Sequence, residues 1–135
     1  MRNRYSLDTS TVIEILRNNE TVMRNLKAAT VEQGRIAICS IVYYEVMRGF
    51  KISDASRRIS QFDALYNHVL PLPLDDLAIE KAIEIYAGLY RGNTIEDADI
   101  FIAAIAMSKG YTLVTSNTRH FERIDGLKII DWREG

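Results

Sequence analysis

The sequence predicts a three-layer α/β protein, in which a central, mainly parallel sheet of roughly five strands lies between two layers of helices. Strand-like and helix-like segments alternate along the chain, which is typical of parallel sheets covered by helices on both faces. Residues 100–107 are apolar at nearly every position, which indicates a helix buried on all sides. The β-branched run TLVT at 112–115 follows Gly110, a usual helix end, and predicts a strand there.

Five short segments are interpreted as strands. They cover residues 4–8, 36–40, 69–74, 112–115 and 127–130. The third run, VLPLPL, contains both prolines of the chain, Pro71 and Pro73. Proline cannot donate to a sheet ladder, so we expect this strand to be short or to lie at an exposed edge.

The segments between these runs show helical spacing of apolar residues. Helices are expected at residues 11–16, 20–33, 41–50, 53–68 and 77–90, and the buried helix is expected to begin near residue 97. Capping chemistry then suggests the helix ends: Ser10 as the first N-cap, Gly34 and Gly49 as stops, Asp75 or Asp76 as a later N-cap, and Thr94 with Asp97 as a capping-box start.

Length and composition are those of an ordinary globular protein. The 135 residues fit one domain, and 47% of them are apolar and 26% charged. A net charge of −1 argues against a protein that coats nucleic acid by bulk charge, but not against an enzyme with a local basic patch and a metal ion. Cys39, the only cysteine, is expected to be a buried packing residue in a reducing, cytoplasmic setting. No membrane-length apolar run or signal peptide is found, so no membrane association is expected.

Four polar side chains are expected near the carboxyl ends of strands, where open α/β sheets place their functional crevice. Asp8 closes the first strand, and Glu45 follows the second by about one helical turn. Asp99 starts the helix that leads into the fourth strand, and Asn117 lies just past that strand. Side chains from distant parts of the sequence can therefore converge on one edge.

Clustered carboxylates repel one another unless a divalent cation neutralises them. Mg²⁺ and Mn²⁺ prefer hard oxygen ligands, and such a site suits phosphodiester hydrolysis because the metal polarises a phosphate oxygen and lowers the pKa of a bound water. The sequence has no Walker-type loop, GxGxxG, CxxC or GxSxG motif that would indicate another chemistry. His68 and His120 are isolated, and we interpret each as an ordinary, partly exposed histidine.

The acidic candidates also have structural interpretations. Asp99 is of a type common in first helical turns, where the helix dipole favours it, so it is also a candidate cap. Asp97 competes with it, but two residues apart on a helix they point to different sides. Glu45 is alternatively a surface glutamate, and we interpret Glu14 and Glu96 as solvated helix charges.

The chain resembles the PIN-domain ribonucleases, in particular the VapC-type toxins of bacterial toxin–antitoxin pairs. The matching pieces are YSLDTSTVIEIL, SIVYYEVMRG, DADIFIAAIA and TLVTSNTRHFERIDGLKIIDW, and their order and spacing cover essentially the whole chain. The resemblance implies a PIN-like fold and a single PIN domain over residues 1–135. By the same resemblance Asp8, Glu45 and Asp99 match the family's three acidic metal ligands, for Mg²⁺ with Mn²⁺ as a substitute, and Asp97 becomes the capping residue.

The resemblance also implies supporting roles around the first acid. Ser10 matches the small polar residue that supports Asp8, and Thr115 and Asn117 match the T-x-[N/D] signature after the fourth strand, so Asn117 is included among the catalytic candidates. Family members often have a further acid near this signature, where this chain has Asn117 and, three residues on, His120. One tightly bound metal ion, with a second arriving with the substrate, is the expectation.

RNA is the substrate that the resemblance implies. Basic residues consistent with phosphate contact are Arg48, Lys51, Arg57, Arg58, Arg119 and Arg123. Of these we select Arg119, which follows the TxN signature closely. The segment TSNTRHFERIDGLKIIDW looks like the enteric branch of these toxins, which is associated with cleavage of initiator tRNA in the anticodon loop.

The resemblance further implies a homodimer and a tight VapB-type antitoxin, with DNA contacted only through that antitoxin. Such antitoxins typically wrap a hydrophobic groove and send a basic residue into the acidic site. Residues 47–52, MRGFKI, and the apolar faces around Tyr43, Met47 and Phe50 are candidates for the groove, or equally for core.

A metal-dependent endoribonuclease toxin is therefore the function indicated by the sequence and its resemblance. The alternative is a catalytically weak PIN-fold module that binds protein or RNA, and the intact set of Asp8, Glu45 and Asp99 argues for the nuclease. The segment DTST at Asp8 also suggests a phosphatase of the haloacid-dehalogenase kind. Those enzymes place a second aspartate two residues on, where this chain has Ser10, so we set that interpretation aside.

Overall fold

The computed structural model of the chain describes residues 3–89, 92 and 95–134. Within these residues, five parallel strands form one sheet in the order β3-β2-β1-β4-β5. The strands are β1 (Arg4–Leu7), β2 (Arg35–Cys39), β3 (Leu70–Leu72), β4 (Thr112–Val114) and β5 (Ile129–Ile130). The predicted parallel sheet is confirmed, and β3 with its prolines lies at an edge, as expected.

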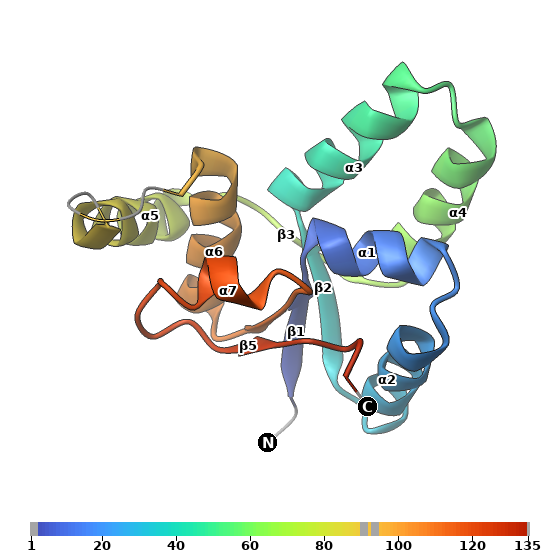
Figure 1. The fold of residues 1–135 in the computed structure, drawn as a ribbon, viewed down its shortest axis with the longest axis horizontal. Coiled ribbons are helices and arrows are strands. Elements are labelled where there is room, and N and C mark those ends of the chain that lie inside the picture. Colours follow the sequence, from blue (N-terminus) through green and yellow to red (C-terminus); the bar gives the residue numbers. More distant parts are fainter. Residues whose placement is uncertain (1–2, 90–91, 93–94, 135) are drawn as a thin grey trace.

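The helices of the described ranges cover both sides of this sheet. They are α1 (Thr9–Leu16), α2 (Glu20–Val31), α3 (Ser40–Ile52), α4 (Ser56–Tyr66), α5 (Asp76–Leu89), α6 (Asp97–Lys109) and the short α7 (Thr118–Phe121). In the view of Figure 1, α1 to α4 lie on one side of β1 and β2, and α5 and α6 lie on the other. The three-layer prediction is therefore confirmed, whereas α7 is an element that the sequence patterns did not predict.

The strand order determines where a functional site can form. The chain runs outward from β1 through β2 to β3, then crosses back to place β4 on the other side of β1. Right-handed crossovers put the helices of these two directions on opposite faces, and in such sheets the functional site lies beyond the carboxyl ends of the strands at this point, here β1 and β4. Asp8 and Thr115 are the residues that directly follow these two strands.

Helix α6 is the buried helix that the sequence predicts. Its residues Ile100 and 102–106 are all buried, and Gly110 ends it in the left-handed conformation with φ 73°. Helix α6 packs against α5, and both helices bury alanines, among them Ala78 and Ala82 on α5; small side chains allow two helices to pack closely. The first turn of α6, which carries Asp99, is thus held against the sheet by the core beneath it.

Several predicted helix ends differ from the structure. Ser10 is not the first N-cap, because α1 already begins at Thr9 and Asp8 occupies the N-cap position. Gly49 does not stop α3, which continues to Ile52, since a helix interior tolerates glycine at a modest cost. Asp97 is not the cap of α6 but its first residue, after the N-cap Glu96. The proposed partner Thr94 lies outside the described residues.

Two other ends follow capping chemistry more closely. The Asp75 side chain accepts a hydrogen bond from the Ala78 amide at 3.0 Å, so Asp75, and not Asp76, caps α5. Helix α2 ends before Gly34, and it is Gln33 that has a positive φ of 61°. A Cβ at position 34 would lie 3.0 Å from the Ala29 carbonyl oxygen, so a larger residue here would crowd the end of α2.

The helices of the described ranges lack the combination of length and apolar character that a bilayer crossing requires.

Ser6 in β1 offers a simple test of the core. Its hydroxyl is buried and has no hydrogen-bond partner among the described residues. We expect Ser6→Ala to leave the free energy of unfolding unchanged or to raise it by about 1 kcal/mol, because an unsatisfied buried hydroxyl is removed. Urea denaturation measures the change.

The matched control is Thr11→Val, because the buried Thr11 hydroxyl donates to the Val114 carbonyl at 2.8 Å. Loss of this satisfied hydrogen bond is expected to cost about 1 kcal/mol. A Ser6→Ala variant that is less stable than the Thr11→Val variant would show that the Ser6 hydroxyl has a partner after all.

Candidate active site

Asp8 is the buried centre of the predicted site. Its Oδ2 accepts hydrogen bonds from the Thr115 hydroxyl at 2.7 Å and the Ser10 hydroxyl at 3.2 Å. Only 6% of Asp8 is exposed, and burial raises the pKa of its carboxyl above 3.8, as does the negative charge of Asp99 nearby, while the hydroxyl hydrogen bonds lower it. The Asp8 side chain is therefore a buried carboxyl group that is hydrogen-bonded by neutral hydroxyls and lies near the charge of Asp99.

The segment after β4 fixes these two hydroxyls in turn. The Ser116 amide donates to Ser10 Oγ at 3.1 Å, and the Asn117 amide donates to Thr115 Oγ1 at 3.0 Å. Each hydroxyl thus accepts from the backbone and donates toward Asp8, so the two roles expected of Ser10 and Thr115 have a geometric basis. Asn117 takes part here through its backbone, and its residue is exposed at the N-cap of α7.

We expect Thr115→Val to lower the free energy of unfolding by about 1–3 kcal/mol. The substitution keeps the shape of the side chain but leaves the Asn117 amide unpaired and takes a hydrogen bond from Asp8. Urea denaturation of the metal-free protein measures this cost.

Thr115→Ser is the matched control, because it keeps the hydroxyl and removes one methyl group. It is expected to be more stable than Thr115→Val. Equal stability of Thr115→Val and the unchanged chain would mean that the hydroxyl does not organise the site.

Glu45 lies on α3 and is hydrogen-bonded to Thr9, the residue that follows Asp8. The Thr9 hydroxyl donates to Glu45 Oε1 at 2.8 Å, and Arg48 Nη2 lies 3.9 Å from Oε2. Its side chain is 19% exposed, so it is not a free surface glutamate. Burial raises the pKa of the Cys39 thiol to about 11, and the charges of Asp8 and Glu45 add to this, so both acids lie near the carboxyl end of β2.

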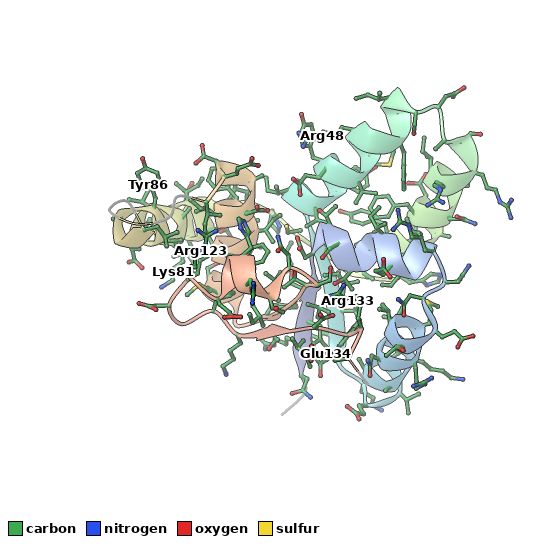
Figure 2. The ribbon with its side chains drawn as sticks, viewed as in Figure 1. Arg48, Lys81, Tyr86, Arg123, Arg133 and Glu134 are labelled. Carbon is green, nitrogen blue, oxygen red and sulfur yellow. The ribbon has the colours of Figure 1, made fainter. Side chains whose placement is uncertain are left out.

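Asp99 lies in the first turn of α6, and its Oδ2 is 2.8 Å from His120 Nε2. Our interpretation of His120 as an isolated histidine is wrong, because α7 folds this side chain back over the start of α6. Arg123 Nη2 lies 3.0 Å from His120 Nδ1. Figure 2 shows Arg123 beside α6 and α7, and Arg48 on α3.

The contact between His120 and Arg123 has a short-range signal in the sequence. His120 and Arg123 are three positions apart, and both follow the TxN signature closely. A turn that begins at Asn117 brings His120 close to the head of α6, which no periodicity of apolar residues predicts. Thr9, which holds Glu45, was also missed, since nothing local distinguishes it from its neighbours Ser10 and Thr11.

The basic candidates have different surroundings. Arg48 lies near Glu45 and over the Tyr44 ring, while Arg123 contacts His120. Arg57 and Arg58 line a cavity of about 330 Å³ with Arg17 at the far end of α1. Arg119 and Lys51 are exposed. Arg119 therefore remains an accessible candidate beside the site.

The candidate groove around α3 is mostly packed. Phe50 is 8% exposed and belongs to the core, and the Tyr43 ring lies 4.6 Å from that of Tyr66 and 5.6 Å from that of Phe62, measured between centroids. Met47 is partly buried against the core. Of the two alternatives, core describes Phe50, and the α3–α4 aromatic cluster covers Tyr43.

The donor chemistry of the site fits a divalent cation. Asp8 is a buried acid near a second acid, Asp99, and its side-chain hydrogen bonds come from neutral hydroxyls. A bound cation would therefore offset both the cost of burying the Asp8 charge and its repulsion by Asp99. Within residues 3–89, 92 and 95–134 no three His, Cys, Asp or Glu side chains are already grouped closely enough to hold one metal ion. The Glu45 carboxylate is instead engaged by the Thr9 hydroxyl and lies near Arg48.

Comparisons with known proteins agree with this geometry. The model of the PIN domain matches residues 5–127. The tRNA(fMet)-specific endonuclease VapC of Shigella flexneri is 30% identical over 131 residues, which cover 96% of this chain and 98% of that relative. Ribonuclease VapC1 of Methanocaldococcus jannaschii is 34% identical, over 93% of this chain and 85% of that protein.

A solved structure shows the same fold. The DNA-bound VapBC of Salmonella typhimurium superposes with a TM-score of 0.88 at 32% sequence identity, covering 98% of this chain and 99% of that chain. The strand order, the acidic residues beyond β1 and β4, and these matches over nearly the full length lead to one conclusion: the chain belongs to the PIN-domain family, among its VapC-type ribonuclease toxins.

Proposed function

We propose that this chain, as a single PIN domain over residues 1–135, is a Mg²⁺-dependent endoribonuclease of the cytoplasm, with Mn²⁺ as a substitute ion. The observation that carries the proposal is Asp8, a buried acid at the switch point of the sheet, held by two fixed hydroxyls and facing the charge of Asp99. The names of its relatives, endonuclease and ribonuclease, support RNA as the substrate.

Asp8 and Asp99 would hold the metal ion, and Glu45 would join them after turning from Thr9. When bound, the ion supplies a polarised phosphate oxygen and a water of lowered pKa. The residues of the chain bind and orient: Ser10 and Thr115 keep Asp8 in place, and Arg119 contacts the RNA backbone. Asn117 contributes its backbone amide to this support and an exposed side chain beside the crevice.

The finer substrate proposal is initiator tRNA, cleaved in the anticodon loop. The relative from Shigella flexneri, which is matched over 98% of its length, is named a tRNA(fMet)-specific endonuclease. The C-terminal segment after β4 carries the enteric pattern noted in the sequence and also lines the site, so substrate preference and catalysis would share this segment.

The proposed partners are a VapB-type antitoxin and a second copy of the chain. The Salmonella typhimurium structure is a DNA-bound VapBC complex, and the present chain matches one of its chains over 99% of that length. DNA would be contacted through the antitoxin alone, since the net charge of −1 gives this chain no general attraction to nucleic acid.

The test is cleavage of total tRNA by antitoxin-free protein in Mg²⁺ or in Mn²⁺, with EDTA and Asp8→Ala as controls. Discrete products are expected that require metal and are absent for Asp8→Ala. Initiator tRNA is expected among the cleaved species. No cleavage of tRNA, rRNA or mRNA by folded, metal-loaded protein would favour the catalytically weak binding module, for which the engagement of Glu45 by the Thr9 hydroxyl is the supporting observation.

A further inference from the structure

Both ring nitrogens of His120 have a partner. Nε2 lies 2.8 Å from Asp99 Oδ2, and Nδ1 lies 3.0 Å from Arg123 Nη2. The Arg123 Nε group also donates to the His120 carbonyl oxygen at 3.3 Å, which fixes the guanidinium relative to the ring. Three side chains from α6, α7 and the turn after α7 thus form one chain of hydrogen bonds that ends on a carboxylate of the site.

The direction of these hydrogen bonds follows from chemistry. A guanidinium has only donors, so His120 Nδ1 must be the acceptor toward Arg123. A nitrogen that accepts carries no hydrogen, and the neutral ring therefore carries its hydrogen on Nε2. Nε2–H then donates to Asp99 Oδ2. The other neutral tautomer would point an N–H at the guanidinium, where it has no acceptor.

We infer that His120 is a positioning residue that acts through Asp99, and that Arg123 selects the tautomer in which it does so. This inference rests on the proposed function, in which Asp99 holds a metal ion. With Oδ2 engaged by His120, Asp99 offers Oδ1, which has no side-chain hydrogen bond among the described residues. Asp8 is held in the same manner, with both hydroxyls on its Oδ2.

The same geometry excludes His120 as a nitrogen ligand of the ion in this arrangement. A ligand nitrogen needs a free lone pair, whereas Nε2 carries hydrogen and the Nδ1 lone pair is used by Arg123. Outer hydrogen-bond partners orient metal ligands, and their loss commonly lowers metal affinity about 10–100-fold. His120 is expected to have an effect of this size on divalent cation binding.

The first measurement is the tautomer itself, by ¹⁵N NMR of the imidazoles in tag-free, RNA-free protein about two pH units above the ordinary histidine pKa of about 6.5. The chain has 2 histidines, so His68→Gln leaves the His120 signals alone in the spectrum. We expect hydrogen on Nε2 in the unchanged ring and a larger population of the Nδ1–H tautomer in Arg123→Met, where only the Asp99 carboxylate still favours Nε2–H. Hydrogen on Nδ1 in the unchanged protein overturns the inference.

The second measurement is calorimetric titration of RNA-free protein with Mn²⁺. A glutamine amide nitrogen can take the place of Nε2, whereas that of asparagine falls short, so His120→Gln and His120→Asn form a matched pair. We expect His120→Asn to bind Mn²⁺ about 10–100-fold more weakly, and His120→Gln and the control His68→Gln to bind like the unchanged chain. Equal binding by His120→Asn and His120→Gln overturns the inference.

These results separate the inference from the proposed function. One possible result is Nε2–H with weakened Mn²⁺ binding by His120→Asn, but no RNA cleavage by the unchanged chain. This result would support the positioning role of His120 and contradict the nuclease. RNA cleavage together with hydrogen on Nδ1 would support the nuclease and contradict the positioning role of His120. Because the tautomer is read in the unchanged ring, this test stands even if His120→Asn does not fold.

Discussion

Asp8→Asn is expected to lower RNA cleavage more than about 100-fold, which exceeds the usual effect of losing a residue that only hydrogen-bonds to a metal ligand. The same substitution is expected to raise the thermal stability of the metal-free protein at neutral pH. The charge of Asp8 is buried beside Asp99, and its pKa is raised above 3.8 by that burial. Asparagine keeps an oxygen for the hydroxyls of Ser10 and Thr115 and removes the buried charge. The midpoint of thermal unfolding with EDTA and a cleavage assay with Mg²⁺ measure the two effects.

The sign of the pH dependence follows from the raised pKa. The protonated Asp8 is the form that the fold favours, so its contribution to stability is fully present below pH 3.8 and is lost as the pH rises through the folded-state pKa. The difference in melting temperature between Asp8→Asn and the unchanged chain is therefore expected to be small near pH 3.8 and to grow as the pH increases.

Asp97→Asn is the charge-matched control, since Asp97 is exposed at the first position of α6. It is expected to leave cleavage and stability nearly unchanged. If Asp8→Asn instead unfolds the metal-free protein, the charged carboxylate of Asp8 stabilises the fold, and the expected cost of burying its charge is contradicted.

Ile102→Ala is expected to lower the free energy of unfolding by about 2–5 kcal/mol. Ile102 lies in α6 with no exposed surface, and truncating it removes buried methyl groups and leaves a cavity in a close-packed interior. The same helix carries Asp99 at its first turn, so cleavage by the folded fraction is expected to persist while the protein unfolds at lower urea concentration. Urea denaturation with an unchanged slope measures the loss.

Ile83→Ala on the neighbouring helix α5 is the control, because Ile83 is 63% exposed. Its cost is expected to stay within about 0.5 kcal/mol. Similar costs for the two substitutions would mean that α6 is not the buried helix of this fold.

The sequence by itself determined the architecture and the type of chemistry. Local patterns sufficed for this: the alternation of strands and helices, the apolar run of residues 100–107, the left-handed Gly110 and the prolines of an edge strand all act over a few neighbouring residues. The resemblance added the three acids and the TxN signature. Helix ends were less well predicted, because the backbone adopted alternatives a few residues from Ser10 and Gly49.

Only the tertiary structure decided how the polar side chains pair. The partners of Asp8, Glu45 and Asp99 come from the residue after β4, from α1 and from α7, and a hydrogen bond requires its two atoms to meet within about 3 Å. His120 looked isolated in the sequence because its partner Asp99 is 21 residues away and meets it only after α6, β4 and α7 have folded. Propensity and periodicity report on contacts within one element, whereas a site at a switch point is assembled from several elements, and its geometry is fixed by the packing of all of them.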